Sequence, residues 1–297
     1  MTLNISDLDT AQTQYYLQHL VAPRPIALAS TIDEEGNVNL SPFSFFNLFS
    51  SNPPIVIFSP ARRTRNNTTK HTLDNIRYVP EVCINIVTYD IVQQASLASC
   101  EYAKGTDEFI KAGFTKVTST FIAPPRVAEA KASLECRVNE IKSLGESGGA
   151  GQLVIAEVIC MHIDDSFFTA DKKIDQQKIE HVARLGADWY ARISSANLFR
   201  VAKPNTQPGV GFDALPEQIK NSAVLTGNHL AQLANVPAVP EINKKFKDDR
   251  LEAIVQYFKP ANNQHTRIHT YAKELIDEGR IDDAWQVLLN SSTSVSA

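Results

Sequence analysis

Short runs of β-branched and aromatic residues alternate with turn-rich breaks from about residue 25 to residue 163. This pattern is typical of a sheet that closes into a barrel or sandwich. Residues 53–60 and 82–89 are apolar runs whose length suits central strands buried on both faces. Residues 134–145 alternate, and the apolar run 152–163 follows after a glycine-rich break, which predicts a hairpin. Further strands are expected at 26–31 and 37–46.

Three short helices are expected between these strands. Residues 71–76 form the first, with Thr72 in position to cap it. Residues 91–100 form the second, and their Ser and Ala content indicates close packing. Residues 105–113 place Thr106 and Asp107 before an amphipathic turn and end at a glycine. The first part of the chain is therefore expected to be mainly β with short connecting helices.

The pattern changes after residue 204, where the strand signal ends and polar helix-forming residues dominate. Apolar positions recur at helical spacing in residues 215–233 and 248–258. Two more apolar stripes follow, separated near Gly279. We therefore expect a first domain at residues 1–204 and an α-helical C-terminal extension at residues 205–297.

Composition narrows the class of protein. Of 297 residues, 43% are hydrophobic and 21% are charged, which excludes an intrinsically disordered chain. The net charge of −4 leaves no overall positive field for nucleic acid or an acidic membrane surface. The first ten residues carry two Asp and no Lys or Arg, so they do not resemble a secretory signal. With no apolar run long enough for a membrane span, the expected location is cytoplasmic.

Three other features have ordinary explanations. The glycine-rich segment 145–151 leads into a strand rather than a helix, so a hairpin turn is favoured over a phosphate-binding loop. Without an activating motif, the cysteines are expected to be reduced, buried and inert. His162 followed by Asp164 and Asp165 lacks the spacing of a metal site, and no metal is expected. The four cysteines are Cys83, Cys100, Cys136 and Cys160.

Two segments suggest chemistry. Residues 61–76 follow a buried strand directly and combine four cations with hydroxyl and amide side chains, the mixture that a terminal phosphate needs. A solvated basic loop explains them equally well, and nucleic-acid contact is a lesser third alternative. Residues 41–54 mix three phenylalanines with small polar side chains. Strand packing explains the aromatic residues, whereas the polar ones suit the edge of a planar heterocycle on an apolar wall. The cations are Arg62, Arg63, Arg65 and Lys70.

Several ordered segments together resemble the flavin reductase-like family of FMN-binding split-barrel proteins, in its flavoredoxin-type branch. The likeness continues with lower specificity to residues 184–192. It implies a homodimer that binds FMN near the subunit interface and passes a hydride from NADH or NADPH to the flavin. The matching segments are PRPIALAST (23–31), NVNLSPFSFFN (37–47), PPIVIFSPARR (53–63), KHTLDNI (70–76) and VCINIVT (82–88).

The resemblance also implies a set of cofactor-binding residues. One group lies along the isoalloxazine ring, a second holds the ribityl chain and phosphate, and a third reaches the flavin region. His71 departs from the family, which commonly has an acidic residue there. In that order the groups are Asn39, Ser41, Ser44 and Asn47; Ser59, Arg62, Lys70 and Thr72; and Arg184, Gly186 and Tyr190.

In such proteins the flavin carries the redox chemistry, and the fold binds it and presents it to the nicotinamide. No catalytic side chain is therefore expected. We interpret the chain as an FMN-dependent NAD(P)H oxidoreductase of the flavin reductase type with an unknown acceptor. One alternative is an FMN-binding electron-transfer protein without a nicotinamide site. Another is a barrel scaffold whose helical extension binds a protein partner.

Overall fold

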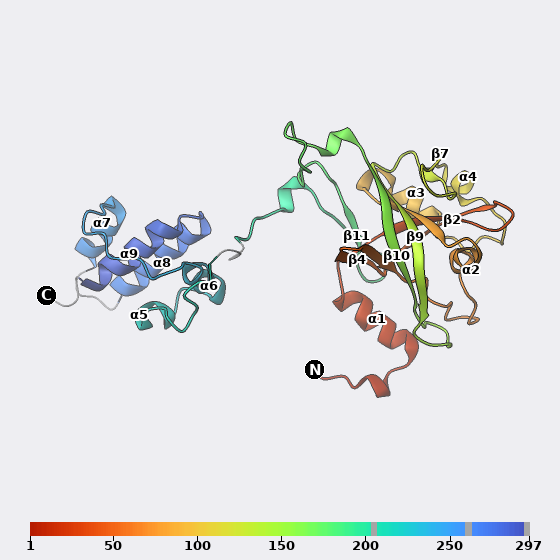
Figure 1. Cartoon of the computed structure of the whole chain (residues 1–297). Coiled ribbons are helices and arrows are strands. Elements are labelled where there is room, and N and C mark those ends of the chain that lie inside the picture. Colours follow the sequence, from red (N-terminus) through yellow and green to blue (C-terminus); the bar gives the residue numbers. More distant parts are fainter. Residues whose placement is uncertain (203–206, 259–262, 294–297) are drawn as a thin grey trace. The chain divides into compact units, whose positions relative to one another are not determined.

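The computed structural model describes residues 1–202, 207–258 and 263–293. The chain divides into two compact units, Met1–Phe199 and Arg200–Ala297. Strands with short helices make up the first unit, and the second is helical (Figure 1). The boundary expected after residue 204 lies outside the described residues. Within the described ranges, no helix has the length and apolarity needed to cross a membrane.

A seven-stranded antiparallel sheet forms the first unit, in the order β3-β2-β6-β9-β10-β5-β4. It confirms the mainly β fold and the hairpin at 134–163, because β9 and β10 pair along their length. The strands are β2 (Ala27–Ile32), β3 (Val38–Phe43), β4 (Phe46–Ser51), β5 (Pro54–Phe58), β6 (Glu81–Ile86), β9 (Ala132–Ser143) and β10 (Gln152–Ile163).

The connection between β3 and β4 explains the split-barrel shape. These two strands lie at opposite edges of the sheet, yet only Ser44 and Phe45 separate them in the chain. The three Cα–Cα steps from Phe43 to Phe46 span at most about 11 Å. The sheet must therefore curl until its two edges approach each other, and the chain crosses the opening there. Phe45 is held at the crossing because its carbonyl oxygen accepts a hydrogen bond from the Ser59 amide at 2.8 Å.

Strand β2 divides the core between its two faces. Ala27 and Ala29 join the cluster that includes Leu73 and Ile76 of α2 (His71–Tyr78). Leu28 belongs to a second cluster beneath α3 (Val92–Leu97) and α4 (Glu108–Ala112). Because successive side chains on a strand point to opposite faces, a strand covered on both sides has almost no exposed position. This explains the near-complete burial of β2.

Smaller elements complete the first unit. A three-stranded sheet has the order β1-β11-β12, and β7 pairs with β8. Helix α1 (Thr10–Leu20) was not expected, although Asp9 and Gln12 form a reciprocal capping box at its start. The short strands are β1 (Arg24–Pro25), β7 (Lys116–Val117), β8 (Arg126–Val127), β11 (Val182–Arg184) and β12 (Tyr190–Arg192); single 3₁₀ turns lie at Ile5–Asp7, Tyr89–Ile91, Asp165–Phe167 and Ser195–Asn197.

Two local predictions in this unit are wrong. Thr72 does not cap α2, because the N-cap is Lys70 and no side chain caps that helix. The Thr72 hydroxyl instead donates to Asn39 Oδ1 at 2.7 Å. The expected burial of the cysteines holds for Cys83 and Cys136 only, since Cys100 is exposed and Cys160 is half-buried.

The second unit has its own hydrophobic core, drawn from residues 215–289. Trp285 is fully buried at its centre and donates from Nε1 to the Leu233 carbonyl oxygen at 3.2 Å. The expected helix at 215–233 is two helices instead, whereas Gly279 separates the last two as expected, in a left-handed conformation with φ +78°. The helices are α5 (Glu217–Lys220), α6 (Gly227–Ala234), α7 (Asp249–Tyr257), α8 (Gln264–Asp277) and α9 (Ile281–Thr293).

Candidate functional site

Three pockets adjoin the crossing of the chain between β3 and β4. The largest, of about 740 Å³, is bordered by Phe45, and a groove of about 620 Å³ shares Phe45 with it. A third pocket, of about 580 Å³, shares Ser44 with that groove. Volumes of roughly 300–1,000 Å³ are typical of sites for small molecules and cofactors. The shared residues make the pockets parts of one continuous site region.

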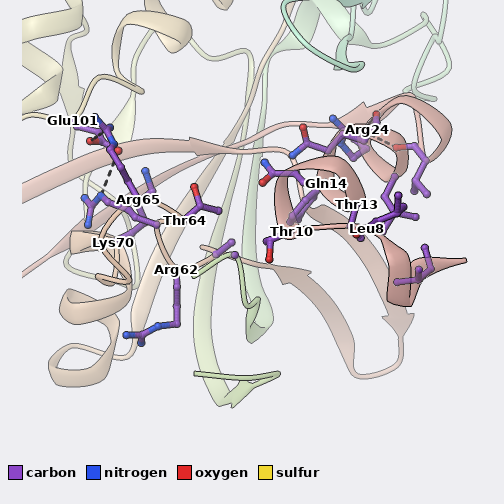
Figure 2. A pocket seen from close by; sticks show the side chains of 18 residues that line it. Leu8, Thr10, Thr13, Gln14, Arg24, Arg62, Thr64, Arg65, Lys70 and Glu101 are labelled. Carbon is purple, nitrogen blue, oxygen red and sulfur yellow. Dashed lines mark hydrogen bonds and ion pairs between the residues drawn. The ribbon is translucent and has the colours of Figure 1, made fainter. Parts of the chain in front are cut away.

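The largest pocket lies between α1 and the loop that follows β5. Figure 2 shows Thr13 and Gln14 of α1 on one side and Arg62, Arg65 and Lys70 on the other. Its ionisable lining is strongly unbalanced, with five cations and one carboxylate. A phosphate or other anion is the chemistry that such a lining favours. The charged residues are Arg24, Arg62, Arg63, Arg65, Lys70 and Glu101.

Most of the loop cations already have partners that fix them. Arg62 donates to the side chain of Asn67 at 2.7 Å and to its carbonyl oxygen at 2.5 Å. Arg63 lies 3.5 Å from Glu101, and Arg65 donates to the same carboxylate at 2.9 Å. These contacts hold the loop in shape, since Arg63 also donates to Thr68 Oγ1 at 3.0 Å.

Lys70 is the exception among these loop residues. Its half-buried ammonium lines the pocket and has no hydrogen-bond or ion-pair partner within the described ranges. Burial lowers the pKa of Lys70, and the neighbouring Arg63 lowers it further, with a smaller opposing effect from Glu101. An unpaired cation beside another cation gains most when an anion binds. Lys70 is therefore the best-placed donor for an incoming phosphate.

The glycine-rich turn of the β9–β10 hairpin packs against the cation-rich loop that follows β5. The Arg62 amide donates to the Ala150 carbonyl oxygen at 2.9 Å, and the Gly149 amide donates to the Arg62 carbonyl oxygen at 3.0 Å. A side chain at Gly148 would place its Cβ 3.0 Å from the Thr64 backbone. Glycine permits this close approach of two backbones. Segment 145–151 thus braces the cation-rich loop, in agreement with the expected turn.

Asn39 and Thr72 belong to a buried hydrogen-bond network behind Lys70. Thr72 donates to Asn39 Oδ1, and Asn39 Nδ2 donates to Glu108 Oε1 at 2.9 Å. The other Glu108 oxygen accepts from the Leu40 amide at 3.0 Å. The network ties β3, α2 and α4 together and leaves Ser41 beside Lys70 in a small adjoining recess. Asn39 and Thr72 therefore position the site through this network, and both line the recess together with Ser41.

The 580 Å³ pocket lies on the other side of the crossing. Ser44, Arg184 and Tyr190 all border it, so segments far apart in the chain meet here as expected. The Arg184 guanidinium lies over the Tyr190 ring, 4.5 Å from its centroid. This stacking holds a cation beside an aromatic surface. Asp188 also borders the pocket and adds a carboxylate.

Three predicted residues lie around the site and have contacts that support its neighbouring elements. Ser59 is buried, and its hydroxyl accepts from the Gln152 amide at 3.0 Å. Asn47 is exposed at the groove, and its side-chain oxygen accepts from the Leu48 amide at 2.8 Å. Gly186 packs on α1, because a Cβ there would lie 2.2 Å from the His19 ring. The absence of a side chain at Gly186 thus lets α1 dock.

Sequence reasoning missed Arg24 and helix α1. Arg24 is buried and borders both the largest pocket and the groove. Its guanidinium donates to the carbonyl oxygens of Gln18, Val21 and Leu185, and its buried Nε has no partner within the described ranges. The reciprocal capping box at Asp9 and Gln12 was the available signal for α1.

The residues present fit a phosphate-bearing planar cofactor such as FMN. An unpaired ammonium and two arginines supply the charge that a terminal phosphate requires. The hydroxyl of Ser41 and the ring of Phe45 lie next to this cationic end, and Ser44 borders the adjoining groove. The lining thus offers both the polar and the apolar surfaces that a ribityl phosphate and a flat heterocycle need.

Fold and site together define a split-barrel protein with a strongly cationic pocket at the opening of the barrel. The chain belongs to the flavin reductase like domain family, whose model matches residues 20–174. It is 31% identical over 173 residues to an uncharacterised protein of Aquifex aeolicus, covering 58% of this chain and 86% of that one.

Two solved structures share the fold. One is nitrilotriacetate monooxygenase component B from Bacillus cereus, with 24% identity and a TM-score of 0.63 over 68% of this chain and 98% of that one. The other is a split-barrel protein from Shewanella frigidimarina, with 28% identity and a TM-score of 0.58 over 68% of this chain and 99% of that one. The resemblance to flavin reductase-like split-barrel proteins is therefore confirmed.

Proposed function

We propose that the first unit binds FMN at the opening of its barrel and uses NADH or NADPH to reduce it. The observation that carries this proposal is the pocket with five cations and one carboxylate, which adjoins the hydroxyl-bearing crossing of the chain. Family membership supports an oxidoreductase of the flavin reductase type. When bound, FMN supplies the redox chemistry, accepting a hydride equivalent and passing electrons to an acceptor.

Lys70 and the two arginines before it hold the phosphate in this proposal. Lys70 brings a cation that lacks a partner, and Arg62 and Arg63 are already oriented by Asn67 and Glu101. His71 adds no charge at neutral pH, because burial and the nearby Arg63 lower its pKa. His71, which departs from the family pattern, therefore leaves the small recess beside Lys70 without an acidic group at this position.

The crossing of the chain contacts the heterocycle in this proposal. Ser41 before it and Ser44 within it line neighbouring recesses, and Phe45 presents an exposed ring. Hydroxyl donors near a ring that gains electron density stabilise the reduced form electrostatically. Arg184 and Tyr190 border the pocket on the far side of Ser44, where a cation and an aromatic face suit a second, nucleotide ligand. We place the nicotinamide nucleotide there.

A homodimer is part of the proposal because apolar side chains are exposed beside the site. Leu20, Val21, Leu48 and Phe49 are each 60–77% exposed, and three of them border the groove with Phe45. Clustered apolar exposure of this kind marks an interaction surface. Sedimentation at several concentrations tests it, and a monomer at all of them would refute it. A cytoplasmic location and a protein partner for the helical extension stay predictions.

Anaerobic visible spectroscopy of the full-length protein with FMN tests the function. A perturbed flavin spectrum that bleaches on addition of NADH or NADPH supports the reductase. A perturbed spectrum that neither nucleotide bleaches favours the electron-transfer alternative. An unperturbed spectrum removes the FMN assignment altogether.

A further inference from the structure

Three side chains that can bind metal ions meet on the β9–β10 hairpin. Glu135 comes from β9, and Cys160 and His162 come from β10. Their ligand atoms lie within 4.8 Å of one another. His162 Nε2 lies 2.6 Å from Glu135 Oε1 and 3.7 Å from Cys160 Sγ. None of the three borders the pockets around the β3–β4 crossing.

Local backbone geometry brings these side chains together. Cys160 and His162 are two residues apart on one strand, so their side chains lie on the same face. The pairing of β10 with β9 shifts by one residue between Val158 and Cys160, and this bulge sets Cys160 directly opposite Glu135. Bulges re-aim side chains and often lie beside functional sites. Without the shift, Cys160 and Glu135 would not be cross-strand partners.

Glu135 is held rigidly, as a metal ligand should be. It is fully buried, and its two oxygens accept hydrogen bonds from the amides of Thr120 and Phe121 at 2.6 and 2.7 Å. Such outer partners fix the orientation of a ligating carboxylate. The His162 side chain is 25% exposed, and Cys160 is half-buried. The cluster thus combines a fixed inner ligand with an approach from solvent.

We propose that Glu135, Cys160 and His162 form a Zn²⁺ site with three protein ligands and a fourth position open to solvent. Thiolate, imidazole and carboxylate together select zinc over the oxygen-preferring Ca²⁺ and Mg²⁺. Zinc bond lengths of about 2.3 Å to sulfur and 2.0–2.1 Å to nitrogen place tetrahedral S and N ligands about 3.6 Å apart. The observed separation of 3.7 Å matches this value.

Binding one tetrahedral ion requires the three ligand atoms to move relative to one another, because they lie within 4.8 Å of one another and tetrahedral S and O ligands lie about 3.6 Å apart. The N–O separation must widen from 2.6 Å to about 3.4 Å for both atoms to bind one tetrahedral ion. The partly exposed His162 ring can make this movement, while Glu135 stays in place. The thiol of Cys160 releases its proton to solvent, and neutral His162 carries its hydrogen on Nδ1 instead of Nε2, so binding one Zn²⁺ releases one proton. A hydrogen bond between His162 and Glu135 that only stabilised the fold would need neither a thiol beside it nor an opening to solvent.

Zinc titration of the chelator-treated full-length protein tests the proposal. We expect one Zn²⁺ per chain by elemental analysis after dialysis. Removing a group that only hydrogen-bonds to a metal ligand typically weakens metal binding about 10–100-fold. Cys160→Ser and His162→Ala remove a ligand itself, so each should weaken Zn²⁺ binding by more than that. Cys100→Ser and His265→Ala are matched controls, since both remove an exposed side chain outside the cluster, and they should leave binding unchanged.

Cobalt gives a second readout that does not depend on stability. Co²⁺ should produce tetrahedral ligand-field bands in the red, where oxidised flavin does not absorb, together with a thiolate charge-transfer band that disappears in Cys160→Ser. No stoichiometric zinc in the wild-type protein would overturn the site. Equal zinc binding by the wild type and by both ligand variants would overturn it as well, and so would a cobalt spectrum typical of octahedral coordination without sulfur.

Discussion

Removing the charge of Lys70 should weaken FMN binding and leave riboflavin binding nearly unchanged. Lys70 is the pocket cation without a partner in the described part of the chain, whereas Arg62 and Arg63 would have to give up existing hydrogen bonds to replace it. A hydrogen bond to a charged group contributes roughly 1.5–3 kcal/mol. Lys70→Ala should therefore raise the Kd for FMN by about ten- to a hundredfold, since about 1.4 kcal/mol is a factor of ten.

Flavin fluorescence quenching under identical salt conditions measures both ligands. Lys111→Ala is the matched control. Lys111 is exposed on α4 and borders none of the pockets described above, so this substitution removes the same charge at a distance from the pocket. The loss for FMN should shrink at high ionic strength as the charges are screened. Equal losses for FMN and riboflavin would refute the assignment of Lys70 to the phosphate. If Lys111→Ala weakened FMN binding as much as Lys70→Ala, the effect would come from the overall charge of the protein and not from a contact in the pocket.

Three further changes test the packing and protonation of the two units. Gly186→Ala should displace the His19 ring and lower the thermal stability of the first unit, and adding His19→Ala should restore most of the loss in a double-mutant cycle. Trp285→Ala should lower the free energy of unfolding of the second unit by about 3–5 kcal/mol in urea titrations, because the ring is fully buried. Burial, assisted by His265, lowers the pKa of His269 to about 4, so the unfolded chain takes up the proton first as the pH falls. Stability of the second unit should thus fall between about pH 6.5 and pH 4, by at most ~3 kcal/mol from this group, and His269→Leu should flatten that part of the curve.

The sheet could be predicted because its signal is local. Residues 26–31 and 82–89 read as strands from β-branched and apolar runs, and the pairing of 134–145 with 152–163 follows from two such runs around a turn. The pattern favoured a barrel or sandwich, but it did not show how the sheet curls. The curl depends on β3 and β4 lying at opposite edges, which is a matter of strand order rather than of residue type.

The sequence showed which residue types the site contains, but not which partners their side chains contact. The cations after β5 stood out in the sequence, but the Thr72 hydroxyl found a partner 33 residues away in Asn39 rather than the helix end beside it. Glu108 lies a further 36 residues along the chain from Thr72 and completes the same network. Buried polar groups take whichever partner the tertiary fold brings near, and spacing along the chain does not record this choice.

Because each unit has hydrophobic core clusters of its own, separating the units is the sharpest test of what the helical extension does. Among the residues that the structure describes, the core of the second unit draws on residues 215–289 and the two core clusters of the first unit draw on residues 26–182. A chain ending at residue 199 should therefore fold, keep its strand signature in circular dichroism and bind FMN with a Kd within about threefold of the full-length value. Lys70→Ala in the shortened chain should cause the same loss as in the full chain. Retained fold with lost FMN binding would instead show that the extension contributes to the flavin site, and an unfolded product would show that the first unit does not fold alone.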